Sequence, residues 1–325
     1  MRMKLAGTSQ EFSHDYSISK KSPLLKKLRK NRSLFIMCLP AIIFFIVFSY
    51  LPMPGLWLAF VRFNFAHGIF GSRFVGIDNF RFLIESGDFW RITRNTILYN
   101  FAFILVGSVV QITLAVLLNE IASKYYRKIT QSMMFLPFFM SHVIIGLMVY
   151  NLISFDFGLL NSIRESLGLA RISVYSMPNA WPFIIVLTHV WQGAGYGAII
   201  YFAAITGMDH EIMEAASVDG ANALKRIRYI ILPMLKPTFV ILFLFSMGGV
   251  LRGNFGLFFN LVGSANFTLF PTTDIIELYV FRALMTNFNF SLGAAVSFYQ
   301  SIFGFALVLF ANWVVRRIEP DYALF

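Results

Sequence analysis

The sequence predicts an all-α membrane protein with six transmembrane helices and both termini in the cytoplasm. Three observations support this fold class. Only 13% of the 325 residues are charged, whereas a water-soluble domain carries about 25%. The mean hydropathy is +0.69. Long apolar stretches also recur along the chain, and most of the charge lies between them.

Each predicted span is long enough to cross a bilayer, which takes about 20 mostly apolar residues in a helix. Helices are expected because the bilayer offers no water to satisfy backbone groups, and the runs are too long for barrel strands. The six stretches are Leu34 to Phe60, Ile97 to Leu118, Ile129 to Ile153, Trp181 to Ile205, Phe239 to Val262, and Leu292 to Val315.

A basic tail over residues 1–33 precedes the first span, which covers 34–60. Nine of the 27 Lys and Arg lie in this tail. A basic segment directly before a long apolar one is typical of a cytoplasmic anchor rather than of nucleic-acid binding. We expect the tail to be retained rather than cleaved as a signal peptide. With the N-terminus inside, the inner segments hold 18 Lys and Arg and the outer segments hold seven. This bias places the N-terminus and a short tail over 319–325 in the cytoplasm.

Two outer segments mix charged and apolar residues at helical spacing: Asp78 to Arg91, within an outer loop over 61–93, and Thr273 to Met285. Asp78 and either Thr272 or Thr273 are candidate N-caps. Short amphipathic helices along the outer membrane interface fit these patterns, as do contacts with an extracytoplasmic partner. An ordinary surface helix fits each segment equally well.

The longest predicted inner loop covers residues 208–237, between the fourth and fifth spans. Asp209 is a candidate N-cap for a first helix that runs to Val218. Gly220 is placed to end this helix because glycine adopts the left-handed conformation at little cost. A second helix is expected from Ala221 to Ile231, and two prolines should limit regular helix beyond it. Small residues at the elbow allow the backbone of another protein to approach, and nearby carboxylates offer charge-assisted contacts.

This loop resembles the EAA signature of ABC importer permeases. The signature reads Glu-Ala-Ala, three residues, Gly, nine residues, then Ile-x-Leu-Pro, and the loop matches its seven fixed positions over 20 residues. Two further positions match the Asp-Gly-Ala variant found in carbohydrate importers. The matching residues are Glu214, Ala215, Ala216, Asp219, Gly220, Ala221, Ile230, Leu232 and Pro233. A pattern of this length between two spans is specific, whereas Glu-Ala-Ala alone would not be.

The resemblance implies a MetI-like permease fold, with a core of five spans over 94–318 and a cytoplasmic coupling loop over 208–237. In that family the first helix of the loop enters a cleft on a separate ATPase subunit. The Glu that matches Glu214 pairs there with a basic residue, and the Gly that matches Gly220 shapes the elbow. Without the surrounding pattern, Glu214 would be an ordinary solvated residue on a helix face.

Similarity to carbohydrate permeases extends over almost the whole chain. The stretches that carry it are Lys26–Trp57, Gly76–Phe80, Asn95–Thr96 and Asn312–Phe325. The last stretch is similar to permeases of alginate and other uronate-rich oligosaccharide importers. Such importers pair two different permeases with an ATPase dimer that binds ATP and Mg, and with an extracytoplasmic solute-binding protein. The resemblance therefore implies a heteromeric complex in the lipid of the bacterial inner membrane that imports an oligo- or polysaccharide.

The sequence lacks the motifs of an enzyme. It has no G-x-x-x-x-G-K-[ST] phosphate loop, so ATP hydrolysis is expected in a partner subunit. The five histidines show neither metal-ligand spacing nor a Ser/His/Asp arrangement. We expect no catalytic residue, metal or cofactor in this chain, and no nucleic-acid partner.

Polar residues within the spans are the candidates for contacts with the substrate. An Arg at the centre of a spanning helix costs about 2.5–3.5 kcal/mol on insertion scales and usually faces a cavity. Aromatic faces and planar amides bind sugars, and a cation suits carboxylated sugars. The candidate pathway residues are Arg252, Asn254, Asn260, Trp191, Gln192, Tyr196, Tyr299 and Gln300. Glycines around Arg252 permit a kink or local unwinding. Polar packing between helices is the alternative interpretation for each candidate.

Two other classes of membrane protein fit the sequence less well than an ABC permease does. An ion-coupled secondary transporter for a small solute should carry acidic residues within its spans and repeated broken helices. The predicted spans are nearly free of Asp and Glu. A membrane scaffold or receptor would leave the pattern from Glu214 to Pro233 unexplained.

Overall fold

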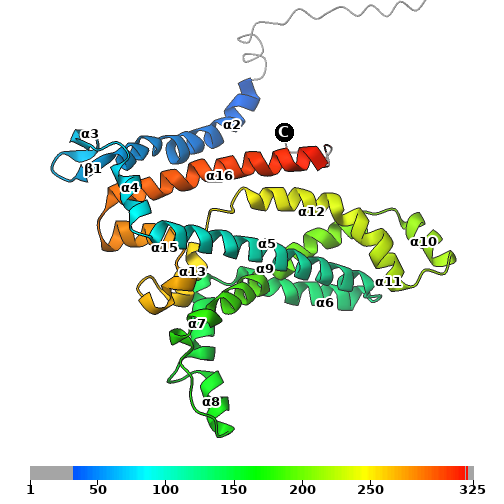
Figure 1. Cartoon of the computed structure of the whole chain (residues 1–325). Coiled ribbons are helices and arrows are strands. Elements are labelled where there is room, and N and C mark those ends of the chain that lie inside the picture. Colours follow the sequence, from blue (N-terminus) through cyan, green and yellow to red (C-terminus); the bar gives the residue numbers. More distant parts are fainter. Residues whose placement is uncertain (1–31, 319, 321–325) are drawn as a thin grey trace, which may run out of the picture. The chain divides into compact units, whose positions relative to one another are not determined.

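The structure is a computed structural model that describes residues 32–318 and residue 320. Most of this range is helical (Figure 1). The chain divides into two compact units, Met1–Pro54 and Gly55–Phe325. The predicted basic tail up to residue 31, and the predicted C-terminal tail apart from residue 320, lie outside the described residues.

The first unit contains one apolar helical segment. Helix α2 (Arg32–Phe45) continues into a π-helical turn, η1 (Ile46–Tyr50). With the 3₁₀ helix η2 (Met53–Phe60), which begins in this unit and ends in the second, it forms a candidate span over Arg32–Phe60. A helix that is apolar all round suits a lipid environment.

Among the described residues, five helices are long and apolar enough to cross a membrane, and a sixth span exists if one bent pair is counted. The four straight candidates in the second unit lie within or around α5, α9, α12 and α16. Their bounds are Asp88–Glu120 for α5, Trp181–Thr206 for α9, Leu232–Met247 for α12 and Phe290–Ile318 for α16. The protein is therefore a multi-pass membrane protein. The six-span count and the orientation of the termini stay predictions.

The third predicted span, Ile129 to Ile153, is not one straight helix. Helix α6 (Lys124–Phe135) and the 3₁₀ helix η3 (Leu136–Phe139) meet α7 (His142–Ile153) at an angle of 95°. Pro137 lies in the 3₁₀ segment, and Ser141 starts α7 by accepting a hydrogen bond from the Ile144 N–H at 3.4 Å. Proline and a fresh N-cap explain why the chain turns here.

The fifth predicted span, Phe239 to Val262, is also interrupted. Helix α12 ends at Met247, and α13 (Phe255–Val262) begins after a non-helical segment over 248–254. This segment is called the break below. The unwinding that the glycines around Arg252 predict is thus confirmed, but a single helix through Val262 is wrong.

Helix α12 begins earlier than predicted, because Pro233 and Pro237 do not interrupt the helical path at its start. Helix α11 (Ala223–Arg226) continues through a π-helical turn, η6 (Ile227–Ile231), into α12. The Leu232 N–H donates to the carbonyl of Ile227, five residues earlier. This wide turn lies directly before Pro233, and it gives the ring more room than a regular turn would. Pro237 lies inside the helix.

The long helices of the second unit pack into a bundle. Helix α5 packs along α9, and α16 contacts α12 and α15 (Ile276–Phe281). Helices α10 (His210–Val218) and α11 lie at one end of this bundle, and α4 (Asp78–Glu85) and α15 lie at the other (Figure 1). Helix α8 (Leu159–Ser166) projects away from the bundle. Two of the three buried apolar clusters contain residues of α15, and the third joins α5, α9 and the start of α12.

The segments predicted to lie on the outer side contain more irregular structure than expected. A two-stranded antiparallel hairpin pairs β1 (Val61–Asn64) with β2 (Ser72–Phe74), and the sequence analysis did not predict it. Asp78 is the first residue of α4 rather than its N-cap, which is Ile77. Thr272 and Thr273 end a short helix, where their hydroxyls donate to the Leu269 carbonyl. The remaining short elements are α3 (Gly68–Gly71), η4 (Val174–Ser176), η5 (Pro178–Ala180), η7 (Phe267–Leu269), α14 (Phe270–Thr273) and η8 (Arg282–Thr286).

Candidate functional site

The first candidate region is the α10–α11 hairpin. Asp209 caps α10 as predicted, because its carboxylate accepts a hydrogen bond from the Glu211 N–H at 2.9 Å. Gly220 ends the helix with φ +75°. The Ala221 N–H donates to the Ala216 carbonyl at 2.9 Å, and the Gly220 N–H donates to the Ser217 carbonyl at 3.1 Å. These two bonds form a Schellman motif, the usual C-terminal cap around a left-handed glycine.

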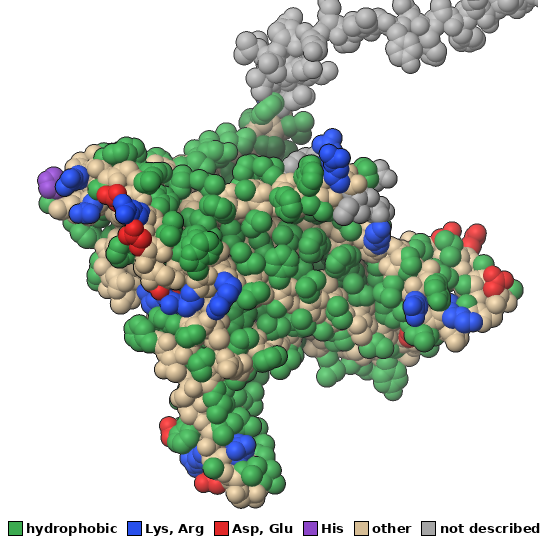
Figure 2. Space-filling model, viewed as in Figure 1, with side chains coloured by type: hydrophobic (Ala, Val, Ile, Leu, Met, Phe, Trp, Pro, Cys, Tyr) green, Lys and Arg blue, Asp and Glu red, His purple; other side chains and the backbone are tan. Residues whose placement is uncertain are grey.

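The hairpin presents most of the signature residues to its surroundings. Glu214, Ala215, Asp219 and Gly220 are exposed, as are Leu232 and Pro233, whereas Ala216, Ala221 and Ile230 are half-buried. Two apolar side chains are also bare: Val218 is 87% exposed and Leu224 is 72% exposed. Figure 2 shows acidic and basic side chains gathered at this end of the bundle, whereas apolar side chains cover the face between the ends. A charged, partly apolar tip of this kind suits docking to another protein.

The second candidate region is an open cavity of about 680 Å³ between helices of the bundle. Helices α5, α9 and α12 and the break all contribute to its lining. Among the predicted pathway residues, Arg252, Asn254 and Tyr196 line this cavity. Arg252 and Gln300 together line a smaller cavity of about 350 Å³ beside α16. The structure therefore places four of the eight candidates at cavities, and Arg252 at both.

The other four candidates lie outside both linings, and three of them have hydrogen-bond partners in the protein. The Gln192 amide donates to the Met140 carbonyl at 3.1 Å, which satisfies the bend between η3 and α7. The Tyr299 hydroxyl lies 3.2 Å from the Thr93 hydroxyl. Asn260 donates to the Gly256 carbonyl at 2.7 Å, and Trp191 is 42% exposed outside either lining. Packing describes the first three of these residues better than a substrate pathway does.

Several polar residues at the larger cavity were not predicted. Asn100, Ser108 and Gln111 from α5 and His189 from α9 all line it. Their signal was present in the sequence, because each is a polar residue inside a predicted span. The His189 ring stacks on Phe103, with 3.8 Å between the ring centroids. Among the described residues, no group of three or more His, Cys, Asp or Glu is arranged to hold a metal ion.

Three side chains hold the backbone of the break. The Asn100 amide donates to the Arg252 carbonyl at 3.2 Å, and the Gln300 amide donates to the Leu251 carbonyl at 2.6 Å. The Gly253 N–H donates to a carboxylate oxygen of Glu277 at 2.5 Å. Burial raises the pKa of Glu277, and hydrogen bonds from Gln300 and Gly253 and the charge of Arg252 oppose this rise.

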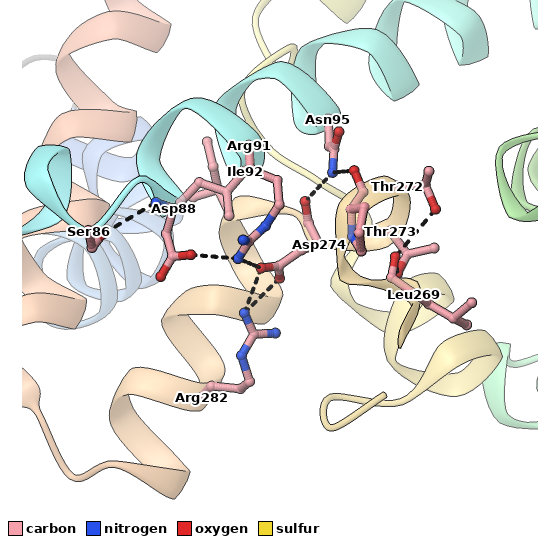
Figure 3. A network of polar contacts seen from close by, with 12 residues as sticks. Ser86, Asp88, Arg91, Ile92, Asn95, Leu269, Thr272, Thr273, Asp274 and Arg282 are labelled. Carbon is pink, nitrogen blue, oxygen red and sulfur yellow. Dashed lines mark hydrogen bonds and ion pairs between the residues drawn. The ribbon is translucent and has the colours of Figure 1, made fainter. Parts of the chain in front are cut away.

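A buried ion-pair network lies at the α15 end of the bundle (Figure 3). Asp274, between α14 and α15, is 0% exposed and receives hydrogen bonds from Arg282 and Arg91. Arg91 also pairs with Asp88 at 2.6 Å. The Asn95 amide donates to the Asp274 carbonyl at 3.0 Å. The network thus joins α5 to the segment that leads into α15.

Residues 104–322, about two thirds of the chain, match the family described as binding-protein-dependent transport system inner membrane component. The chain belongs to this family. The match includes the α10–α11 hairpin, the break and the larger cavity apart from Asn100 and Phe103.

Known proteins extend the similarity over more than 90% of the chain. The polygalacturonan/rhamnogalacturonan transport system permease protein YteP of Bacillus subtilis is 32% identical over 302 residues, which cover 93% of each chain. A bacterial ABC transporter involved in the import of the acidic polysaccharide alginate contains a chain that is 32% identical, with a TM-score of 0.82. The similarity covers 91% of this chain and 99% of that one. A bacterial alginate ABC transporter in complex with an alginate pentasaccharide-bound periplasmic protein gives a TM-score of 0.81 at 32% identity, over 91% and 98% of the two chains.

The family, the sugar-transport relatives and these structures identify the chain as a permease subunit of a sugar ABC importer. The resemblance that the EAA-type loop indicated is thereby confirmed. Proteins of this kind are transport components rather than enzymes, and the secondary-transporter alternative is not favoured.

Proposed function

We propose that this permease imports an acidic oligo- or polysaccharide of the alginate class and that Arg252 contacts the carboxylates of the sugar. The main support is the position of Arg252. Arg252 is exposed and is among the residues that line both cavities, and none of the ion pairs among the described residues involves it. A guanidinium beside a cavity within the membrane suits an anionic ligand.

The second part of the proposal concerns how transport is driven. The α10–α11 hairpin docks on a separate ATPase dimer, which binds ATP and Mg, and Glu214 pairs there with a basic residue. A second, different permease completes the pathway in the bacterial inner membrane, and an extracytoplasmic binding protein delivers the sugar. ATP binding changes the relative stability of two pathway conformations, because it stabilises one arrangement of the docked hairpins over the other. The exposed signature residues and the capped elbow at Gly220 support this assignment.

The test of the substrate proposal is direct binding to the assembled transporter without the binding protein, whose own preference would otherwise dominate. The ligands are an alginate oligosaccharide and the same oligosaccharide with its carboxylates reduced to alcohols. Arg252→Ala should weaken binding of the acidic ligand about tenfold, which is 1.4 kcal/mol, and should leave the reduced ligand within about twofold. Arg164→Ala on α8, away from both cavities, is the matched control. Equal affinities of wild type and Arg252→Ala for the acidic ligand would contradict the proposal.

Uptake into proteoliposomes tests the driving force. Transport should require ATP on the ATPase side and should stop without it. Uptake driven by a proton or sodium gradient in the absence of ATP would support the secondary-transporter alternative instead.

A further inference from the structure

The break contains peptide groups that a helix cannot satisfy. Between Met247 and Phe255 the backbone leaves the helical path in the middle of an apolar segment. Unsatisfied N–H and C=O groups at membrane depth cost several kcal/mol each, so irregular backbone there must find protein partners. In this chain, three consecutive residues of the break have side-chain partners. Leu251 bonds to Gln300, Arg252 to Asn100, and Gly253 to Glu277.

Glu277 has the most constrained place of the three. One oxygen of its carboxylate accepts from both the Gly253 N–H at 2.5 Å and the Gln300 amide at 2.7 Å. The other oxygen is buried and has no hydrogen-bond partner among the described residues. Gly253 fits this contact because a Cβ at that position would collide with the Glu277 carboxylate and with Ile275. The carboxylate thus lies directly against the backbone of the break.

The held segment carries Arg252, which lines both the 680 Å³ cavity and the 350 Å³ cavity. The Gln300 amide bonds to the residue before Arg252, and Glu277 bonds to the residue after it. The backbone from which the Arg252 side chain projects is therefore held on both sides. Glu277 comes from α15, outside the candidate spans, so the outer segment supports a residue inside the pathway.

We propose that Glu277 is a positioning residue for transport: its carboxylate fixes the backbone at Gly253 and so keeps the Arg252 guanidinium at the two cavities. This inference rests on the proposed role of Arg252 in recognising an acidic sugar. A direct contact between Glu277 and such a sugar is disfavoured, because two carboxylates repel each other. Charge-assisted hydrogen bonds are stronger than neutral ones, which suits an acceptor shared by two donors.

The first test is a double-mutant cycle on the assembled transporter. Binding of the alginate oligosaccharide and of its carboxyl-reduced form is measured for wild type, Arg252→Ala, Glu277→Ala and the double variant. Glu277→Ala should weaken binding of the acidic ligand about fivefold to tenfold and leave the reduced ligand within about twofold. The double variant should be no weaker than Arg252→Ala alone, because the loss acts through Arg252. Glu277→Gln should recover most of the affinity, since its amide oxygen can accept from the Gly253 N–H.

The outcomes separate the inference from the proposed function. If Arg252→Ala weakens acidic binding but Glu277→Ala does not, the inference is wrong and the proposed function stands. Losses that multiply in the double variant, or that are equal for both ligands, would assign Glu277 a general structural role and overturn the inference. If Arg252→Ala has no effect on binding of the acidic ligand, the inference about Glu277 and the proposed role of Arg252 are both wrong.

The second test measures positioning without any sugar. Cys38 is the only cysteine, so a nitroxide label can be placed by Arg252→Cys in a Cys38→Ser background. Glu277→Ala should increase the mobility of this label in the assembled complex, whereas Glu277→Gln should restore it. A label at Ser246→Cys, on α12 at the edge of the same cavity, is the control and should not change. An Arg252→Cys label whose mobility is insensitive to Glu277→Ala would overturn the inference even if affinity fell.

Discussion

Arg282 donates two hydrogen bonds to Asp274, at 2.7 and 2.8 Å. The Asp274 side chain is fully buried and also pairs with Arg91. The Arg282 guanidinium also lies over the Phe270 ring, 4.2 Å from its centroid. This charge-assisted pair, in which one Arg282 nitrogen, Nη2, donates to both carboxylate oxygens, is stronger than a neutral hydrogen bond. It therefore holds the segment before α15, and with it the start of the helix that carries Glu277.

Asp274→Asn should destabilise the folded permease strongly. The change leaves two guanidinium groups facing a neutral amide in a buried site, and removing one partner of a buried pair costs about 3–5 kcal/mol. The measurement is the free energy of unfolding of the purified subunit in detergent, or the midpoint of its thermal unfolding.

Asp88→Asn is the matched control for this prediction. It makes the same chemical change and removes a partner of Arg91, but the Asp88 side chain is 31% exposed. A partly exposed pair contributes about 0–1 kcal/mol. Equal losses from Asp274→Asn and Asp88→Asn would contradict a special role of the buried pair.

Glu214→Ala should separate sugar binding from ATP hydrolysis. Loss of a charge that is buried on docking costs about 2–5 kcal/mol, so retention of the ATPase during purification should fall at least about tenfold. Sugar-stimulated ATPase activity should fall with it, whereas direct sugar binding should not change. Glu211→Ala on the same helix is the control, because Glu211 is exposed and lies outside the signature. An ATPase that co-purifies equally with both variants would refute the docking role of Glu214.

Gly220→Ala should loosen the elbow of the hairpin without any steric clash. A Cβ at Gly220 would meet nothing within 4 Å, but φ is +75°. The left-handed conformation costs a non-glycine residue about 1–2 kcal/mol. Hydrogen exchange of the Gly220 and Ala221 amides, which form the cap, should accelerate about fivefold or more.

Gly193→Ala is the control for the elbow prediction. A Cβ there also meets open space, but Gly193 lies inside α9, where alanine is favoured over glycine. This variant should be neutral or slightly stabilising. Unchanged exchange at the elbow of Gly220→Ala would show that backbone conformation does not limit the hairpin.

Local signals in the sequence were enough to predict much of this fold. The apolar runs predicted the long helices, and Asp209 and Gly220 predicted the ends of α10, because a cap depends on residues within one turn. The bend in the third span was not predicted, and the glycines around Arg252 indicate unwinding in the fifth span but not what holds the unwound backbone. Carbonyls at the two interruptions are satisfied by Gln192 and Gln300, which lie 52 and 49 residues away from Met140 and Leu251 along the sequence. A pattern read over a few turns contains no information on such partners.

The candidate site shows the same limit. A polar residue in an apolar span must have some partner, and this rule identified Arg252, Asn254 and Tyr196, which line the larger cavity. The rule does not say whether the partner is substrate or protein, so Gln192 and Tyr299 were proposed although they bond to protein groups. Glu277 is not among the candidates for another reason: it belongs to an amphipathic segment outside the candidate spans and reaches the break only through the tertiary fold.

The buried carboxyl of Glu277 predicts a pH dependence of stability with a definite sign. Burial raises its pKa above the ordinary value of 4.5, with Arg252 as the charged neighbour that opposes the rise. The folded chain therefore keeps this proton at a pH where the unfolded chain has released it. The contribution of Glu277 to stability is complete below about pH 4.5 and declines as pH rises through its folded pKa.

Glu277→Gln tests this sign because the amide does not ionise. The difference between the unfolding midpoints of Glu277→Gln and wild type should become more positive as pH rises from about 4 towards neutrality, since only wild type then pays for a buried charge. Thermal unfolding of the detergent-solubilised complex over a pH series measures this difference. Glu211→Gln, an exposed residue on α10, is the control for the substitution itself. A constant difference would mean that Glu277 ionises in the folded protein as easily as in water, and a shrinking one that it ionises more easily; either result would contradict the prediction.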